Sequence, residues 1–367
     1  MPNHFIYILV AFLVSAVSGF VLIPSVIDFC KKHHIYDVPN QRKVHSNAIP
    51  RLGGVCFLPS MLLALLIALA VFGRVTGEQK ISANPWTLMF LFSLLIVYAT
   101  GLIDDIAELR PRTKFIAQVV AASLLPISGL YLNNFYGLFG IHEVPFWVGA
   151  PLTVFIIVFI DNAINLIDGI DGLSSGLTFI SLSGFLYCFA RESVWVYCIL
   201  IAGLMGVLVP FMYYNLFGKP EKNTKIFMGD SGSLTLGFIL AFLVVKFVMD
   251  NPRVMPFRQD GLLLSYTLLI IPTFDVVRVI LKRIRLHRGI FEADKNHIHH
   301  KLLAAGMNQH QALITILSFE ICYMVLNLVV LAAFDITYIV VTDVIIFMVF
   351  HLMLDVVIHR RELLKTS

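Results

Sequence analysis

Eleven long apolar runs divide this 367-residue chain, and they restrict its fold more than any other feature. A helix needs about 20 apolar residues to cross the hydrocarbon core of a bilayer, and only helices or closed barrels satisfy their backbone amides there. The sequence therefore predicts an all-α, polytopic integral membrane protein with about eleven transmembrane helices. The runs lie near residues 5–29, 52–73, 85–104, 115–132, 146–167, 172–190, 194–216, 232–249, 262–281, 312–334 and 337–358.

The composition agrees with a membrane protein. Only 14% of the residues are charged and 58% are hydrophobic, whereas a soluble domain carries about 25% charged residues. No repeat, low-complexity segment or soluble domain separates the runs, so residues 1–367 are expected to form one membrane domain without a nucleic-acid partner. The first run has no basic segment before it and no small-residue cleavage site, so we expect it to be retained.

The basic residues predict the orientation of the chain. Twenty of the 27 lysines and arginines lie in alternate connections and the C-terminal tail, whereas five lie on the opposite side. Basic residues concentrate in cytoplasmic loops, so we expect the N-terminus outside and the C-terminus in the cytoplasm. The smaller set contains Arg74, Lys80, Arg191, Arg253 and Arg258.

The predicted cytoplasmic side also carries most of the acidic residues at the ends of apolar runs. Carboxylates in such places are costly unless they meet water, a cation or a base. Their convergence on one face therefore predicts a site open to the cytoplasm. The set contains Asp37, Asp104, Asp105, Glu108, Asp168, Asp171, Asp230 and Asp294.

The first acidic motif is Asp104-Asp105, followed by Glu108, Arg112 and Lys114. Mg²⁺ is usually held by one or two carboxylates together with phosphate oxygens, and the nearby basic residues suit a phosphorylated ligand. The alternative is a solvated helix end that carries charges.

The second motif reads Asn162-Ala-Ile-Asn165-Leu-Ile-Asp168-Gly-Ile-Asp171-Gly. The spacing of three places Asn162, Asn165 and Asp168 on one stripe of a helix end. The two Asp-Gly pairs break the helix, and irregular backbone at membrane depth is tolerated where it lines a cavity. A plain turn between two helices is the alternative, but it does not need the two asparagines.

The third motif, Gly229-Asp230-Ser-Gly232-Ser233, comes just before an apolar run. A helix start offers free amides to phosphate, and the carboxylate suits a metal ion. The same residues also fit an ordinary helix N-cap.

Two further stretches are rich in basic residues and histidine. The segment from Asp294 to Lys301 contains His297, His299 and His300, which favours contact with a diphosphate or sugar; a surface loop and a zinc site are the alternatives. The loop with Lys43 and His45 also suits phosphate, although ordinary positive-inside charge explains it equally well.

Taken in order, these motifs resemble those of the polyprenyl-phosphate N-acetylhexosamine-1-phosphate transferase family, also called the glycosyltransferase 4 family. The resemblance runs from about residue 37 to 301, which is most of the chain. The form His-Ile-His-His is similar to the branch that transfers GlcNAc-1-phosphate from UDP-GlcNAc to undecaprenyl phosphate. Phospho-MurNAc-pentapeptide translocase and other sister transferases are the alternatives. The family often has Asp where this chain has Glu108, which puts the role of that residue in doubt.

The resemblance implies a Mg²⁺-dependent enzyme, with Mn²⁺ as the alternative cation, in the bacterial cytoplasmic membrane. Asp230 and Asn165 would hold the metal, and Asp104 and Asp105 would be catalytic at the reacting phosphates. The partners would be undecaprenyl phosphate, a UDP-N-acetylhexosamine and membrane lipid, with either a monomer or a homodimer open. The implied substrate-binding residues are Lys43, His45, Arg112, Lys114, Asn162, Asp168, Asp171, His297, His299 and His300.

Three other classes of protein fit the sequence less well. An intramembrane prenyltransferase needs two similar Asp-rich helical motifs, but the second motif here is Asp-Gly-x-Asp-Gly. A CDP-alcohol phosphotransferase needs Ala-Arg after its Asp-Gly pair, whereas Ser-Ser-Gly follows Asp171-Gly-Leu. A secondary transporter keeps its charges near the middle of the bilayer, in repeated halves, and this sequence has no visible repeat.

Overall fold

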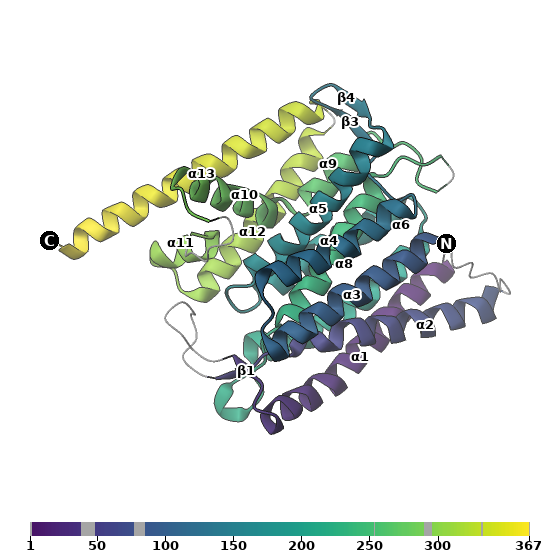
Figure 1. Cartoon of the computed structure of the whole chain (residues 1–367), viewed down its shortest axis with the longest axis horizontal. Coiled ribbons are helices and arrows are strands. Elements are labelled where there is room, and N and C mark those ends of the chain that lie inside the picture. The colour runs from purple at the N-terminus through teal and green to yellow at the C-terminus, as the bar shows by residue number, and fades with distance from the viewer. Residues whose placement is uncertain are drawn as a thin grey trace.

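The computed structural model describes residues 2–37, 48–76, 85–252, 254–289, 296–331 and 333–366, and these ranges are mostly helical (Figure 1). The helices are α1 (Pro2–Lys32), α2 (Phe57–Thr76), α3 (Pro85–Ala107), α4 (Pro111–Ile127), α5 (Phe146–Ile167), α6 (Leu173–Arg191), α7 (Trp195–Met212), α8 (Asp230–Val248), α9 (Gly261–Thr267), α10 (Ile270–Arg285), α11 (Ile298–Ala304), α12 (Gln309–Val330) and α13 (Ile336–Thr366). Three shorter helical turns are η1 (Gly53–Cys56), the π-helix η2 (Tyr213–Phe217) and η3 (Pro220–Lys222).

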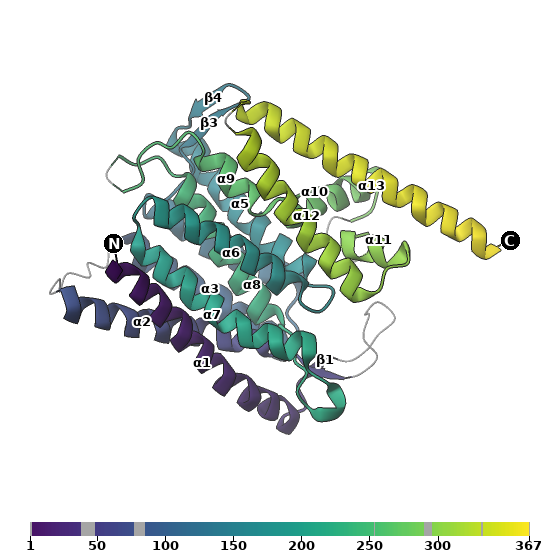
Figure 2. The same ribbon diagram turned by 180° about the vertical axis from the view of Figure 1, so that it is seen from behind.

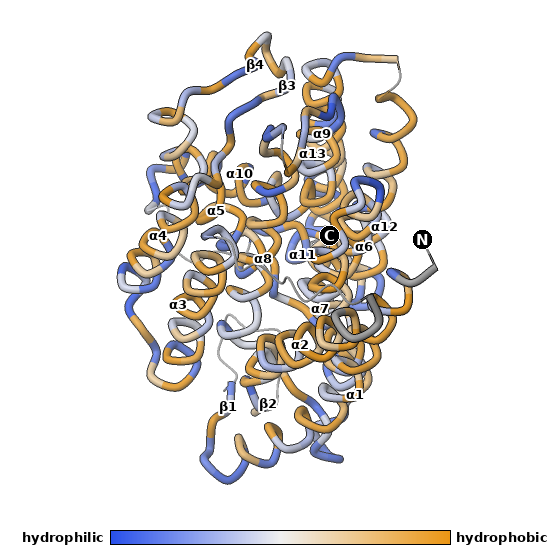
Figure 3. The backbone as a smooth tube through the Cα atoms, turned by 90° about the vertical axis from the view of Figure 1, so that its right-hand side faces the viewer, coloured by the Kyte–Doolittle hydropathy of each residue, from blue (hydrophilic) through white to orange (hydrophobic). Residues whose placement is uncertain are grey.

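Nine helices in the described ranges are long and apolar enough to cross a membrane. The helix α4 packs between α3 and α5, and its 17 residues are at the short end of the range for a span. The bent pair α9 and α10 accounts for the remaining predicted run. Apolar residues follow the helices and polar residues gather at the connections (Figure 3). The predicted all-α, polytopic membrane fold is therefore confirmed.

The run predicted as one helix over residues 262–281 is broken. The helices α9 and α10 meet at an angle of 73°. Pro272 lies in the first turn of α10, where its missing amide is tolerated. The neighbouring amide of Ile271 donates to Oε2 of Glu320 in α12 at 3.0 Å. A carboxylate from another helix thus satisfies the new helix start, which a search for apolar runs does not detect.

The helix α8 lies at the centre of the bundle. Its residues from Ser231 to Val248 are all buried, and α3, α5, α6 and α9 pack around it. A helix that is apolar on every side is buried in this way. The motif at its N-terminus is therefore surrounded by other helices.

The connections at the two ends of the bundle differ. The N-terminus and the hairpin of β3 (Asn134–Leu138) and β4 (Ile141–Glu143) lie at one end, whereas β1 (Tyr36–Asp37) and the C-terminus lie at the other (Figures 1 and 2). The strand β1 pairs with β2 (Ile49–Pro50). The sequence did not predict these short sheets. The segment 282–311, predicted as a connection, contains the end of α10 and the helix α11.

Candidate active site

The N-terminus of α8 is anchored by Asp105, in the last turn of α3. Oδ1 of Asp105 accepts the amide of Asp230 at 2.8 Å, and Oδ2 accepts the amide of Ser231 at 2.9 Å. These amides have no partner within their own helix, and a negative charge is favourable beside them. Gly229 has a φ of 74°, and a Cβ atom there would lie 2.6 Å from Oδ2 of Asp105. Asp105 therefore fixes the position of Asp230.

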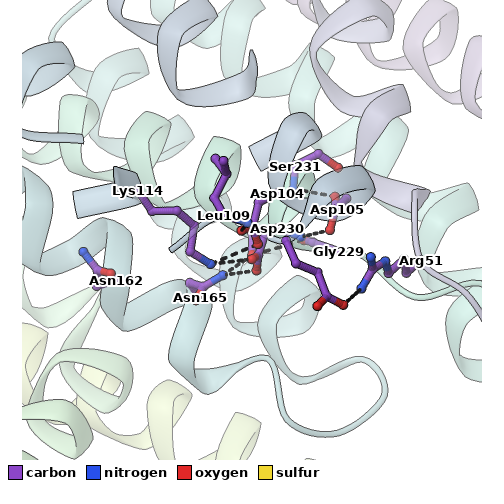
Figure 4. A network of polar contacts seen from close by, with 12 residues as sticks. Arg51, Asp104, Asp105, Leu109, Lys114, Asn162, Asn165, Gly229, Asp230 and Ser231 are labelled. Atoms are coloured by element: carbon purple, nitrogen blue, oxygen red, sulfur yellow. Dashed lines mark hydrogen bonds and ion pairs between the residues drawn. The ribbon is translucent and has the colours of Figure 1, made fainter. Parts of the chain in front are cut away.

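Lys114 joins the first and third acidic motifs. Its Nζ lies 3.0 Å from Oδ2 of Asp104 and 2.7 Å from Oδ2 of Asp230 (Figure 4). Asn165 at the end of α5 donates through Nδ2 to Oδ1 of Asp230 at 2.7 Å and to Oγ of Ser233 at 2.7 Å. Three motifs that are far apart in the sequence therefore meet at the carboxylate of Asp230.

A cavity of about 520 Å³ lies beside this group, within the usual range for small-molecule sites. Acidic and basic residues share its wall. At one point of that wall, Nη1 of Arg51 lies 3.6 Å from Oε1 of Glu108. The acidic, basic, amide and histidine side chains that line the cavity are Asp37, Arg51, Asp104, Asp105, Glu108, Lys114, Asn165, Asp168, Asp171, Asn215, Asp230, His300 and Gln309.

The Asp-Gly-Ile-Asp-Gly loop between α5 and α6 is held by two residues outside the predicted site. Nζ of Lys225 lies 2.7 Å from Oδ2 of Asp171. Oδ1 of Asn215 accepts the amide of Gly172 at 2.7 Å, and its Nδ2 donates to the carbonyl of Ile226. Asn215 lies in η2, and π-helical turns are frequent at functional sites. The signal for it was an asparagine at the end of an otherwise apolar run.

The three histidines have different surroundings. His300 lines the cavity. His297 is buried, and its Nδ1 lies 2.8 Å from Oδ2 of Asp275 in α10. His299 is buried under Gly169, where a Cβ atom would lie 2.1 Å from its Nε2. Burial and the neighbouring histidines lower the pKa of His299 to about 3, so its ring is neutral.

Other predicted site residues lie away from the cavity or outside the described ranges. Nδ2 of Asn162 donates to Oε1 of Gln118 at 3.0 Å, and Asn162 is set apart from the Asp230 group in Figure 4. Arg112 is exposed in the first turn of α4. Lys43 and His45 fall outside the described residues. The substrate-binding roles of these four residues stay predictions.

Asp168 gives the site a pH-dependent group. Asp168 is exposed at the cavity wall. Even so, the protein around its carboxyl withdraws part of it from water and, with the negative charges of Asp230, Asp171 and Asp105, raises its pKa to about 7. Protonation therefore stabilises the folded chain below the ordinary pKa of 3.8, and this contribution is lost as the pH rises through 7. We expect the Tm of Asp168→Asn, relative to wild type in EDTA, to increase between about pH 5 and pH 8. A constant difference would contradict the raised pKa.

The donor set fits a magnesium ion that shares the oxygens of a phosphorylated ligand. The ammonium group of Lys114 lies between Asp104 and Asp230, so this position already accommodates a cation. Among the described residues, no group of three His, Cys, Asp or Glu side chains has the geometry of a metal site. A closed zinc centre needs such a group, whereas Mg²⁺ takes one or two carboxylates, phosphate and water.

The fold and the site together define a polytopic membrane protein whose cavity combines carboxylates and cations, as a site for a phosphorylated ligand does. Residues 86–248 match the model of the family described as glycosyl transferase family 4. A Bacillus subtilis protein named probable undecaprenyl-phosphate N-acetylglucosaminyl 1-phosphate transferase is 30% identical over 324 residues, covering 86% of this chain and 83% of the relative. The chain belongs to glycosyl transferase family 4.

Two other relatives agree with this assignment. The undecaprenyl-phosphate alpha-N-acetylglucosaminyl 1-phosphate transferase of Yersinia pestis is 28% identical over 289 residues, covering 77% of this chain and 73% of the relative. The decaprenyl-phosphate N-acetylglucosaminephosphotransferase of Mycobacterium leprae is 30% identical over 301 residues, covering 76% of this chain and 72% of the relative. The family recognised from five ordered motifs is confirmed.

Proposed function

We propose that this enzyme transfers GlcNAc-1-phosphate from UDP-GlcNAc to undecaprenyl phosphate, releases UMP and begins the synthesis of a cell-envelope polysaccharide. The observation that carries the proposal is the bridge from Lys114 to Asp104 and Asp230 at the cavity wall. A polyphosphate ligand needs such a mixed site, with cations for its oxygens and carboxylates for a divalent metal. The names of the relatives supply the sugar and the lipid.

The cofactor that we propose is Mg²⁺. The predicted ligands Asp230 and Asn165 would hold it, and Asp104, whose carboxylate lies beside them, would add a further oxygen. When bound, the ion would withdraw charge from the diphosphate of the donor. Oδ2 of both carboxylates faces Lys114, so oxygen donors of the type that Mg²⁺ prefers converge there. Mn²⁺ has the same ligand preference and is the alternative.

The reaction joins two anions, so the main task of the protein is to neutralise charge and to align the reactants. An oxygen of the lipid phosphate attacks the sugar-linked phosphorus of the donor, the bond to UMP breaks, and UMP leaves with the electron pair. A phosphate monoester has its second pKa near 6 and is mostly dianionic at neutral pH. The acceptor therefore needs little help from a base.

The contacts of the two neighbouring aspartates suit positioning roles. Oδ1 of Asp104 accepts the amide of Leu109 at 2.7 Å, and its Oδ2 faces Lys114. In this proposal Asp104 orients Lys114 and the acceptor phosphate and also offers an oxygen to the metal ion. Both oxygens of Asp105 accept amides of α8, so Asp105 acts on the reaction through the position of Asp230.

We propose that the cavity opens to the cytoplasm and that the enzyme resides in the bacterial cytoplasmic membrane. The bias of lysine and arginine supports this orientation. The cavity then lies on the side where nucleotide sugars are made, while the long prenyl chain of the acceptor stays in the bilayer.

The proposal is tested by UMP release from purified protein with undecaprenyl phosphate and Mg²⁺. UDP-GlcNAc, UDP-GalNAc and UDP-MurNAc-pentapeptide are compared in parallel. We expect release from UDP-GlcNAc. EDTA should lower the rate by a factor of about 100 or more, and added Mg²⁺ should restore it. Release only with another sugar would assign the chain to a sister activity.

No release from any donor by folded protein would reject the proposed transfer. Counterflow of radiolabelled sugar nucleotide into proteoliposomes would then test the transporter alternative. Full activity in EDTA would instead reject the metal assignment and leave the sugar and lipid assignments in place.

A further inference from the structure

The helix α10, which follows the break after α9, carries a polar stripe that the proposed reaction does not use. Asp275, Arg278 and Lys282 follow the spacing of three and four residues that places side chains on one helix face. Asp275 is fully buried. A carboxylate in a membrane-spanning segment is costly to bury unless it is paired, and such residues usually mark a functional site. All three residues bond to the segment that leads into α11.

The contacts between the stripe and this segment involve three consecutive residues. Oδ1 of Asp275 accepts the amide of Ile298 at 3.1 Å, and its Oδ2 bonds Nδ1 of His297 at 2.8 Å. Arg278 donates to Oδ1 of Asp275 at 2.7 Å and to the carbonyl of Asn296. Lys282 donates to the side chain of Asn296. Residues 296–298 are thus attached to α10 through both backbone and side chains.

This attachment decides where the next two residues point. The helix α11 has only seven residues, and such a short helix is not stable without tertiary contacts. Immediately after the attached segment, His299 packs under Gly169 of the Asp-Gly loop and His300 reaches the cavity wall. The rings of His299 and His300 lie 4.2 Å apart. Asp275 itself lies outside the cavity wall.

We propose that Asp275 is a positioning residue for the sugar nucleotide: through His297 and the amide of Ile298 it sets the His-Ile-His-His segment, so that His300 faces the donor. The proposal rests on the proposed function. It accounts for the buried carboxylate and for His297 facing Asp275.

The test measures steady-state kinetics of Asp275→Asn, which keeps the shape of the side chain and removes its charge. We expect the KM for UDP-GlcNAc to rise about 10-fold with kcat within about 3-fold, since a ground-state contact is lost. The matched control is Asp343→Asn. Asp343 is also buried in the membrane part and is bonded to Asn327 at 2.8 Å, so we expect its KM to be unchanged.

A double-mutant cycle distinguishes positioning from a general loss of structure. In a His300→Ala background, we expect Asp275→Asn to have little further effect on KM, because both changes remove the same contact with the donor. Additive effects would overturn the proposal. So would a fall in kcat and Tm with KM unchanged.

If Asp275→Asn does not fold, Arg278→Met tests the same attachment, because Arg278 bonds both Asp275 and the carbonyl of Asn296. We expect the same rise in KM. A KM equal to that of wild type would overturn the proposal. Wild-type protein is assayed first. Absence of UMP release from wild type is a failure of the proposed function, whereas an active wild type with unchanged KM in the variants is a failure of this inference alone.

Discussion

Replacing Asp230 with asparagine is expected to lower the rate of UMP release by a factor on the order of 10³ or more. The two carboxylate oxygens each face a nitrogen donor, Lys114 at Oδ2 and Asn165 at Oδ1. An amide has only one oxygen, so one donor would face an NH₂ group. The variant also loses the charge that is proposed to hold Mg²⁺. The measurement is UMP release at saturating UDP-GlcNAc, undecaprenyl phosphate and Mg²⁺.

The matched control is Asp28→Asn. Asp28 is an exposed aspartate in α1, and its ion pair with Lys31 spans one helical turn. Exposed pairs of this kind contribute about 0.2–1 kcal/mol to stability, so we expect wild-type turnover and Tm. If Asp230→Asn kept turnover within a few-fold of wild type, the assignment of Asp230 as the metal ligand would be wrong.

The membrane fold could be predicted from the sequence because a bilayer imposes a simple rule on local composition. Each predicted run corresponds to a helix in the structure, and among the described residues the run over 262–281 is the one divided into two helices at a sharp bend. The break escaped prediction because its cause is a tertiary contact, the carboxylate of Glu320 on the amide of Ile271. Local apolarity does not report such contacts.

The sequence predicted the site residues that belong to recognisable motifs, but not a residue whose partner is remote along the chain. Asp104, Lys114, Asn165 and Asp230 were all named from motifs, and the structure brings them together. Asp275 was missed because it lies within an apolar run, and the partner that explains it is 22 residues away. His299 was grouped with His300 by sequence, but a helix turns adjacent residues toward different neighbours.

Replacing Lys114 with methionine is expected to lower turnover by a factor on the order of 10², while the Mg²⁺ concentration for half-maximal activity falls. The ammonium group bridges Asp104 and Asp230, so it neutralises both carboxylates and also competes with a metal ion for their oxygens. Methionine keeps most of the length of the side chain without its charge. The two carboxylates then repel each other and attract a divalent cation more strongly. The measurement is the rate of UMP release over a Mg²⁺ titration.

Lys222→Met is the control for this change, because Lys222 is exposed in η3 and lies outside the cavity wall. We expect both its turnover and its Mg²⁺ dependence to match wild type. If Lys114→Met instead needed more Mg²⁺, Lys114 would help to build the metal site and would not compete with it. The direction of this shift therefore separates two roles that a loss of turnover alone leaves indistinguishable: a lysine that holds the carboxylates ready for the metal, and a lysine that the metal displaces toward the phosphates of the substrate.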